Sequence, residues 1–222
     1  MSAAAPAASR GPLVVLDADS TLIREEAIEL LAEEAGTLAH VAAVTERAMR
    51  GELDFAESLR ERVATLAGLD ASILPRVRER MTPTPGLDRL IAGVHAAGGR
   101  IGVVSGGFHE LLDPLAERLG LDHCRANRLE IDGGRFTGRV LGPIIDAEAK
   151  AVALAEWAAA GGIPIARTIA AGDGANDLRM LETAALGVAF CAKPVVRSRA
   201  DVVIDRPDLS QLLPLAGLAD AG

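Results

Sequence analysis

The sequence predicts an α/β fold: a Rossmann-like parallel sheet with helices on both faces and a small helical cap inserted after the first strand. Three observations indicate this fold. The apolar run 13–16 is typical of a short, buried parallel strand. Residues 24–83 carry apolar residues at helical spacing and contain no convincing strand. From residue 84 onward, helical patterns alternate with short apolar runs, as in a sheet covered by helices.

The predicted organisation has three parts. Residues 1–11 are small and rich in Ala and Pro, so we expect a disordered tail. Residues 12–23 and 84–222 form the predicted α/β core, and residues 24–83 form the predicted cap. The cap ends in a segment with two prolines and a glycine, Thr82 to Gly86, which breaks the helical pattern.

The individual elements follow from periodicity and from the glycines that interrupt it. In the cap, glycines at 36, 51 and 68 separate three or four predicted helices. In the core, the predicted elements are helix 87–97, strand 101–104, helix 108–119, a hairpin with strands 129–132 and 135–140, helix 147–160, strand 167–171, helix 175–184, and strands 188–191 and 201–204.

Composition excludes several classes of protein. The net charge is −8 and no long basic run occurs, so we expect no nucleic-acid partner. No apolar run approaches the ~20 residues of a membrane span, so we expect no membrane association. Cys124 and Cys191 lack metal-ligand spacing and are interpreted as buried free thiols, which favours a reducing, cytoplasmic location.

Two carboxylates, Asp17 and Asp19, come directly after the first apolar run. The carboxyl ends of strands are where open α/β sheets bind ligands. Carboxylates crowded there repel each other unless a cation neutralises them, and Mg²⁺ prefers oxygen ligands with only one or two carboxylates. The pair therefore predicts a Mg²⁺ site with an aspartate left free for chemistry.

A second acidic group follows the apolar run 167–172. Asp173 lies between two glycines, which allow a tight turn, and Asp177 follows four residues later at the start of a predicted helix. Gly-Asp-Gly alone is ordinary turn chemistry. Two acidic groups at the ends of two strands nevertheless favour one shared site.

Two further features complete the pattern. Ser105, Gly106 and Gly107 follow the predicted strand 101–104, and Lys150 lies near the start of a predicted helix. Considered alone, the Ser105–Gly107 segment is interpreted as a plain turn and Lys150 as a solvated surface lysine. Their order along an α/β chain, between the two acidic groups, is what indicates a site.

In this order the segments 17–21, 105–107 and 172–177, together with Lys150, resemble the four motifs of the haloacid dehalogenase-like phosphatases. The resemblance covers about residues 12–206. One departure is Ala151, where a glycine is expected after the lysine.

This resemblance implies a phosphatase that works through an aspartyl-phosphate. Asp17 would be the nucleophile, and Asp19 would donate a proton to the leaving oxygen and later accept one from water. Mg²⁺ would be held by the Asp17 carboxylate, the main-chain carbonyl of Asp19 and Asp173, with Asp177 in support.

The same resemblance implies the groups that hold the phosphate ester. Ser105 and Lys150 would contact phosphoryl oxygens, and the Gly106 N–H would join them at the start of a helix. Asn176, in the second acidic segment, would also bind substrate.

The insert resembles the cap of those family members that act on O-phospho-L-serine, in the segments 19–29, 49–55 and 58–63. By that resemblance, Glu26 would hold the substrate ammonium and Arg62 its carboxylate through a bidentate pair. Met49 and Phe55 would form the apolar wall that closes over the substrate.

The expected function is hydrolysis of O-phospho-L-serine, the last step of serine synthesis, by a monomer or homodimer. Another small phosphate, such as phosphohomoserine or phosphothreonine, remains open as the substrate, and an alcohol could accept the phosphoryl group instead of water. A non-catalytic sensor of phosphometabolites is disfavoured because Asp17 and Asp19 are both present.

Overall fold

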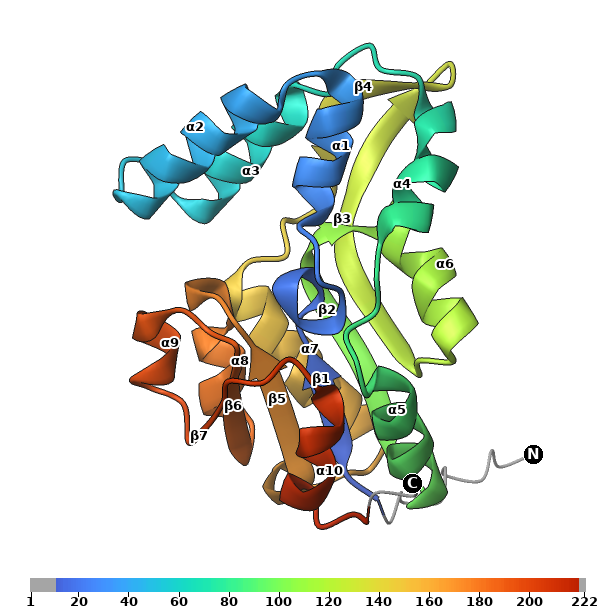
Figure 1. Ribbon diagram of the computed structural model, residues 1–222, viewed down its shortest axis with the longest axis vertical. Helices are drawn as coiled ribbons and strands as arrows, with labels where there is room; N and C mark the ends of the chain where they lie inside the picture. The colour runs from blue at the N-terminus through green and yellow to red at the C-terminus, as the bar shows by residue number, and fades with distance from the viewer. Residues whose placement is uncertain (1–10, 220–222) are drawn as a thin grey trace, which may run out of the picture.

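The computed structural model describes residues 11–219, apart from the Met49 side chain. The disordered tail expected for residues 1–11 lies outside these residues, except for the buried Gly11. Figure 1 shows an α/β lobe around the sheet and, beyond the carboxyl ends of its central strands, a lobe of helices. None of the described helices is long and apolar enough to cross a membrane.

A seven-stranded sheet, in the order β4-β3-β2-β1-β5-β6-β7, forms the core. Its strands are β1 (Leu13–Leu16), β2 (Arg100–Phe108), β3 (His123–Asp132), β4 (Arg135–Leu141), β5 (Thr168–Gly172), β6 (Leu186–Phe190) and β7 (Val202–Ile204). All neighbouring strands are parallel except β3 and β4, which form the predicted hairpin. The prediction of a mostly parallel sheet is confirmed.

Helices cover both faces of this sheet, as predicted. They are α5 (Leu87–Ala96), α6 (His109–Leu119) and α10 (Leu212–Leu215) on one face, and α7 (Ala147–Ala160), α8 (Leu178–Thr183) and α9 (Pro194–Arg197) on the other. Side chains of β1 point alternately to the two faces of the sheet. Val14 and Leu16 pack in the hydrophobic core beneath α5, α6 and α10, and Leu13 and Val15 pack in the core beneath α7, α8 and α9. Asp17 is therefore anchored at the end of a strand that is buried on both sides.

Strand β2 differs from its predicted form. We expected it to end at residue 104, but it continues to Phe108 with a register shift between Val104 and Phe108. The two glycines of the Ser105–Gly107 segment permit this bulge. Helix α6 starts only at His109, so the expectation that the Gly106 N–H lies at a helix start is wrong.

The cap contains four α-helices, in agreement with the predicted three or four: α1 (Ala27–Ala35), α2 (Leu38–Met49), α3 (Phe55–Ala64) and α4 (Leu74–Arg80). Helix α3 begins with a capping box, in which the Glu57 N–H donates to Asp54 at 2.7 Å and the Asp54 N–H donates to Glu57 at 3.0 Å. This box fixes the start of the helix that carries Phe55 and Arg62.

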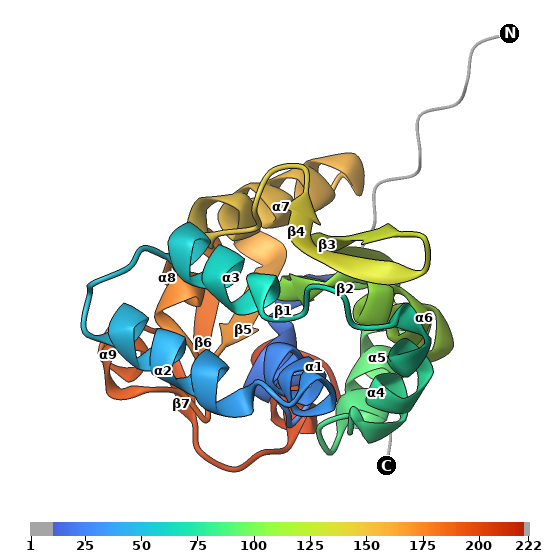
Figure 2. The ribbon, with the colours of Figure 1, turned by 90° about the horizontal axis from the view of Figure 1, so that it is seen from above.

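The cap is also bonded to the β3–β4 hairpin. The Gly68 N–H donates to the Phe136 carbonyl at 2.8 Å, and the Phe136 N–H donates to the Leu69 carbonyl at 3.0 Å. The Ala71 N–H donates to Gly134 at 2.8 Å. The hairpin belongs to the predicted core, residues 84–222, yet it supports the segment that follows α3, as the view from above in Figure 2 illustrates.

Both cysteines are free, but the expectation that both are buried is wrong. Cys124 is half-buried, and burial raises the pKa of its thiol to about 12. Cys191 is exposed because it lies just beyond the last residue of β6, where the chain turns with a φ of 47°.

Candidate active site

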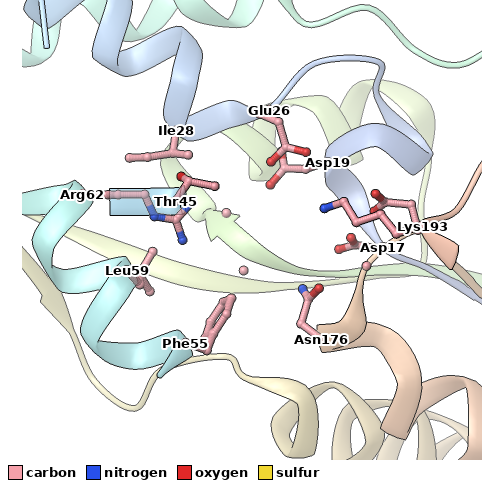
Figure 3. A pocket seen from close by; sticks show the side chains of 14 residues that line it. Asp17, Asp19, Glu26, Ile28, Thr45, Phe55, Leu59, Arg62, Asn176 and Lys193 are labelled. Carbon is pink, nitrogen blue, oxygen red and sulfur yellow. The ribbon is translucent and has the colours of Figure 1, made fainter. Parts of the chain in front are cut away.

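The carboxyl ends of β1, β2 and β5 face the cap across a cavity of about 180 Å³. Its walls come from both lobes (Figure 3) and consist of Asp17, Asp19, Glu26, Ile28, Thr45, Phe55, Leu59, Arg62, Gly106, Gly107, Asp173, Gly174, Asn176 and Lys193. A wider cavity of about 780 Å³ adjoins it and shares Thr45, Phe55, Arg62, Asn176 and Lys193. The structure thus brings most of the predicted site residues to one place.

A buried triad of charges forms the floor of the site. The Lys150 ammonium donates to Asp17 at 2.6 Å and to Asp177 at 2.7 Å, and neither Lys150 nor Asp177 is exposed to solvent. Burial raises the pKa of Asp17 well above its usual value, with repulsion from Asp177 adding to it and Lys150 opposing it. Burial would lower the pKa of Lys150, but Asp17 and Asp177 together raise it. The lysine therefore stays charged and holds both carboxylates.

Gly172 explains how the second acidic segment can approach this triad. A Cβ at this position would lie 2.4 Å from the Asp177 carboxylate, so only glycine leaves room for that side chain. The Asp177 oxygen that Lys150 does not contact, Oδ2, accepts the Gly174 N–H at 2.9 Å. The glycine pattern of the sequence thus serves close packing around Asp177.

Gly172→Ala should lower the free energy of unfolding by roughly 1–3 kcal/mol, because the added methyl overpacks a site whose neighbour is fixed by Lys150. Urea denaturation of the metal-free protein measures this loss. Gly161→Ala is the matched control, since its Cβ would approach no atom closer than 3.2 Å. Equal stability of the two variants would contradict the close packing of Asp177.

Asp19 is held by the cap rather than by the triad. Its carboxylate accepts the Ala27 N–H at the start of α1 at 2.9 Å. Burial raises the pKa of Asp19 to about 7, and the nearby Glu26 adds to this rise while the Ala27 N–H opposes it. Glu26 in turn accepts a hydrogen bond from the Ser20 hydroxyl at 2.9 Å. Ser20 has a φ of 56°, a conformation that serine rarely adopts.

The residues present fit a divalent cation. Carboxylate oxygens of Asp17, Asp173 and Asp177 lie within 4.8 Å of one another. Burial raises the pKa of Asp173 to about 6, repulsion from Asp177 adds to this, and Lys193 opposes it. Three carboxylates face the single ammonium of Lys150, so the cluster keeps a net negative charge that a bound cation would neutralise. The Asp19 side chain is outside this group, so its predicted metal contact depends on its carbonyl.

The Ser105–Gly107 segment is held from behind by Asn127. The Asn127 amide donates to the Gly106 carbonyl at 2.8 Å and accepts the Ile145 N–H at 2.9 Å. The Ser105 hydroxyl oxygen accepts the Gly107 N–H at 2.8 Å, which leaves its own proton available for a ligand. Ser105 is fully buried and does not line the cavity, whereas Gly106 and Gly107 do.

The cap supplies the opposite wall. Arg62 extends from α3 into the cavity (Figure 3), and its Nε donates to the Ser58 carbonyl at 3.3 Å. Burial lowers the pKa of Arg62, and Glu26 opposes this most strongly, so the two charges act across the same space. Phe55 meets the core at Gly106, since a Cβ there would lie 2.7 Å from the ring. The side chain of Met49, the other predicted wall residue, lies outside the described structure.

Several residues of this site were not predicted from the sequence. Thr45, Ile28 and Leu59 line the cavity without a sequence signal beyond ordinary helical patterning. Lys193 did carry a weak signal, because it lies three residues beyond the end of β6, near the edge of the sheet where Asp17 follows β1. Asn127 lies within β3, far along the chain from the segment it holds.

Comparison with known proteins places this geometry among phosphatases. Residues 14–182 match the haloacid dehalogenase-like hydrolase family. A phosphoserine phosphatase of Streptococcus thermophilus is 50% identical over 203 residues, 91% of this chain and 94% of that protein. One of Streptomyces coelicolor is 55% identical over 93% of this chain, which spans 50% of that protein's length. A solved phospho-aspartyl intermediate analogue of phosphoserine phosphatase matches with a TM-score of 0.87 at 40% identity, covering 93% of this chain and 99% of that one.

Proposed function

Because the chain belongs to the haloacid dehalogenase-like hydrolase family, we propose that it is a Mg²⁺-dependent phosphatase that converts O-phospho-L-serine and water to L-serine and phosphate. The observation that carries this proposal is the pairing of a buried aspartate–lysine triad with Glu26 and Arg62 across one small cavity. The names of the relatives point to the same substrate. This activity would complete the synthesis of L-serine.

In the proposed reaction, an Asp17 oxygen attacks phosphorus and the bond to the serine oxygen breaks. Asp19 gives its proton to that oxygen, and its pKa of about 7 suits a group that is protonated part of the time near neutral pH. Water then attacks the aspartyl-phosphate and loses a proton to Asp19, which frees phosphate and restores Asp17. Lys150 stabilises the anionic form of Asp17 by the hydrogen bond at 2.6 Å.

The other residues have proposed roles in binding. Mg²⁺ would be held by Asp17, Asp173 and the Asp19 carbonyl with Asp177 in support, and it would neutralise charge on the phosphoryl oxygens. The Ser105 hydroxyl and the N–H of Gly106 would donate to those oxygens, and Asn176, which lines the same cavity, would also bind the substrate.

Substrate selection is assigned to the cap. Glu26 would hold the ammonium and Arg62 the carboxylate, because they bring opposite charges to one cavity. Phe55 would close the apolar side. The cavity of about 180 Å³ suits a small ester rather than a phosphorylated protein.

A phosphate-release assay tests this function and its metal. O-phospho-L-serine should be turned over with Mg²⁺, and turnover should stop after chelation and return when Mg²⁺ is restored. The panel should include phosphothreonine, phosphohomoserine and a sugar phosphate, with and without an acceptor alcohol. Faster turnover of a sugar phosphate, or full activity after chelation, would refute the proposal.

Ser20 should act through Glu26. Ser20→Ala removes the hydroxyl at 2.9 Å from Glu26 and should raise KM for phosphoserine by about 5- to 10-fold, as expected for a partly exposed hydrogen bond to a charged group. Phosphoglycolate, which lacks the ammonium, should be affected little.

Ser20→Gly is the matched control for this variant. It also lacks the hydroxyl, but glycine adopts the φ of 56° without strain. A similar rise in KM for both variants supports the hydroxyl's role. Wild-type KM in Ser20→Gly would show that Ser20 serves only the backbone conformation.

A further inference from the structure

Lys193 lies where the inner cavity opens into the outer one. It lines both, together with Thr45, Phe55, Arg62 and Asn176. Figure 3 shows its side chain directed from the core toward Asp17, on the opposite side of the cavity from Arg62. Lys193 is exposed, so a ligand moving from the outer cavity to the floor of the site passes it.

The main chain positions this lysine independently of its ammonium. The Lys193 N–H donates to the Asp173 carbonyl at 3.0 Å, and the residue is the N-cap of α9, with Pro194 directly after it. The ammonium is close enough to Asp173 to oppose the rise of that carboxyl's pKa. Exchanging the side chain therefore leaves the backbone bond in place.

The balance of charge shows why such a cation is needed. Asp17, Asp19, Glu26 and Asp173 line the inner cavity, and Asp177 lies behind them. Lys150, the cation that residues 11–219 place on the floor of the site, is fully buried and already bonded to two carboxylates. With a divalent cation bound, that ion, Lys150 and Arg62 at most balance the carboxylates, and they do so only when Asp19 carries its proton, so no net positive charge is left to attract a phosphate dianion.

On these grounds the geometry points to Lys193 as a phosphate-binding residue, which contacts the phosphoryl group of the entering ester and the phosphate that leaves. Arg62 and Lys193 are the two cationic side chains that line the inner cavity of the described structure. They come from opposite lobes, so they can meet opposite ends of one small substrate. This assignment rests on the proposed function.

The test compares Lys193→Met, which keeps length without charge, with Lys193→Arg, which keeps charge. For Lys193→Met we expect KM for phosphoserine and the inhibition constant of inorganic phosphate each to rise about 10- to 100-fold, as for a lost hydrogen bond to a charged group. The rate constant kcat and the Mg²⁺ concentration for half-maximal activity should change little. Lys193→Arg should stay within about threefold of wild type.

Arg179→Met is the control, because Arg179 lines only the outer cavity and is paired with Glu148. Unchanged KM and phosphate inhibition in Lys193→Met would overturn the assignment. It would also be overturned if KM and the inhibition constant rose as much in Lys193→Arg or in Arg179→Met as in Lys193→Met. If wild type releases no phosphate from phosphoserine, the proposed function fails. Calorimetric binding of inorganic phosphate to wild type and Lys193→Met then decides the role of Lys193 alone.

Discussion

Asp17→Asn should reduce phosphate release by at least about 1,000-fold, equivalent to more than about 4 kcal/mol of transition-state stabilisation. The amide is nearly isosteric with the carboxylate but is a poor nucleophile. The fold should persist, because Lys150 keeps its bond to Asp177 at 2.7 Å and burial already disfavours the Asp17 anion. Phosphate release by the purified variant and its thermal melting curve check both points. More than trace activity, free of contaminating phosphatase, would exclude Asp17 as the nucleophile.

Two companion variants separate chemistry from metal binding. Asp19→Asn should also be inactive, but its affinity for Mg²⁺ should change little, because its proposed metal contact is made by the main chain. Asp173→Asn should weaken Mg²⁺ binding more, since its carboxylate belongs to the aspartate cluster. Titration of Mg²⁺ into both proteins ranks the two effects, and the reverse order would contradict this division of roles.

The position of the catalytic centre could be predicted because strand ends carry it. The run 13–16 and the run 167–172 become β1 and β5, which are neighbours in the sheet, so Asp17 and Asp173 had to meet. Helical spacing in residues 24–83, with the glycines and prolines that interrupt it, predicted the helices α1 to α4, because helices and buried strands differ in the spacing of their apolar residues.

What could not be predicted depends on backbone geometry or on contacts distant in sequence. Nothing local indicates the left-handed turn at Ser20 that places its hydroxyl on Glu26. Asn127 reaches Gly106 only because β3 pairs with β2. The bulge after Val104 shows the same limit, since the two glycines equally suit a strand end or an interrupted strand.

In the proposed function, the choice of substrate depends most on Arg62. Arg62→Ala should reduce kcat/KM for phosphoserine by about one and a half to three and a half decades, because losing one partner of a desolvated charge pair costs ~2–5 kcal/mol. The fall in kcat/KM should be far smaller for phosphoethanolamine, which lacks the carboxylate. Arg62→Lys should recover only part of the loss, since an ammonium cannot make the bidentate contact. Steady-state kinetics on both esters measures the contrast.

Arg60→Ala provides the matched control, because Arg60 lies on the same helix two residues earlier but is exposed and does not line the cavity. It should leave kcat/KM for both substrates unchanged.

Glu26→Gln should show the complementary pattern. It should lower kcat/KM for amine-bearing esters and change kcat/KM for phosphoglycolate little, because Glu26 faces the same cavity as Arg62. If Arg62→Ala and Glu26→Gln instead lower kcat/KM by the same small factor for every substrate, Arg62 and Glu26 are both solvated helix charges. The phosphoserine assignment would then fail while Asp17 chemistry on phosphate esters could still stand, because the triad around Lys150 does not depend on the cap.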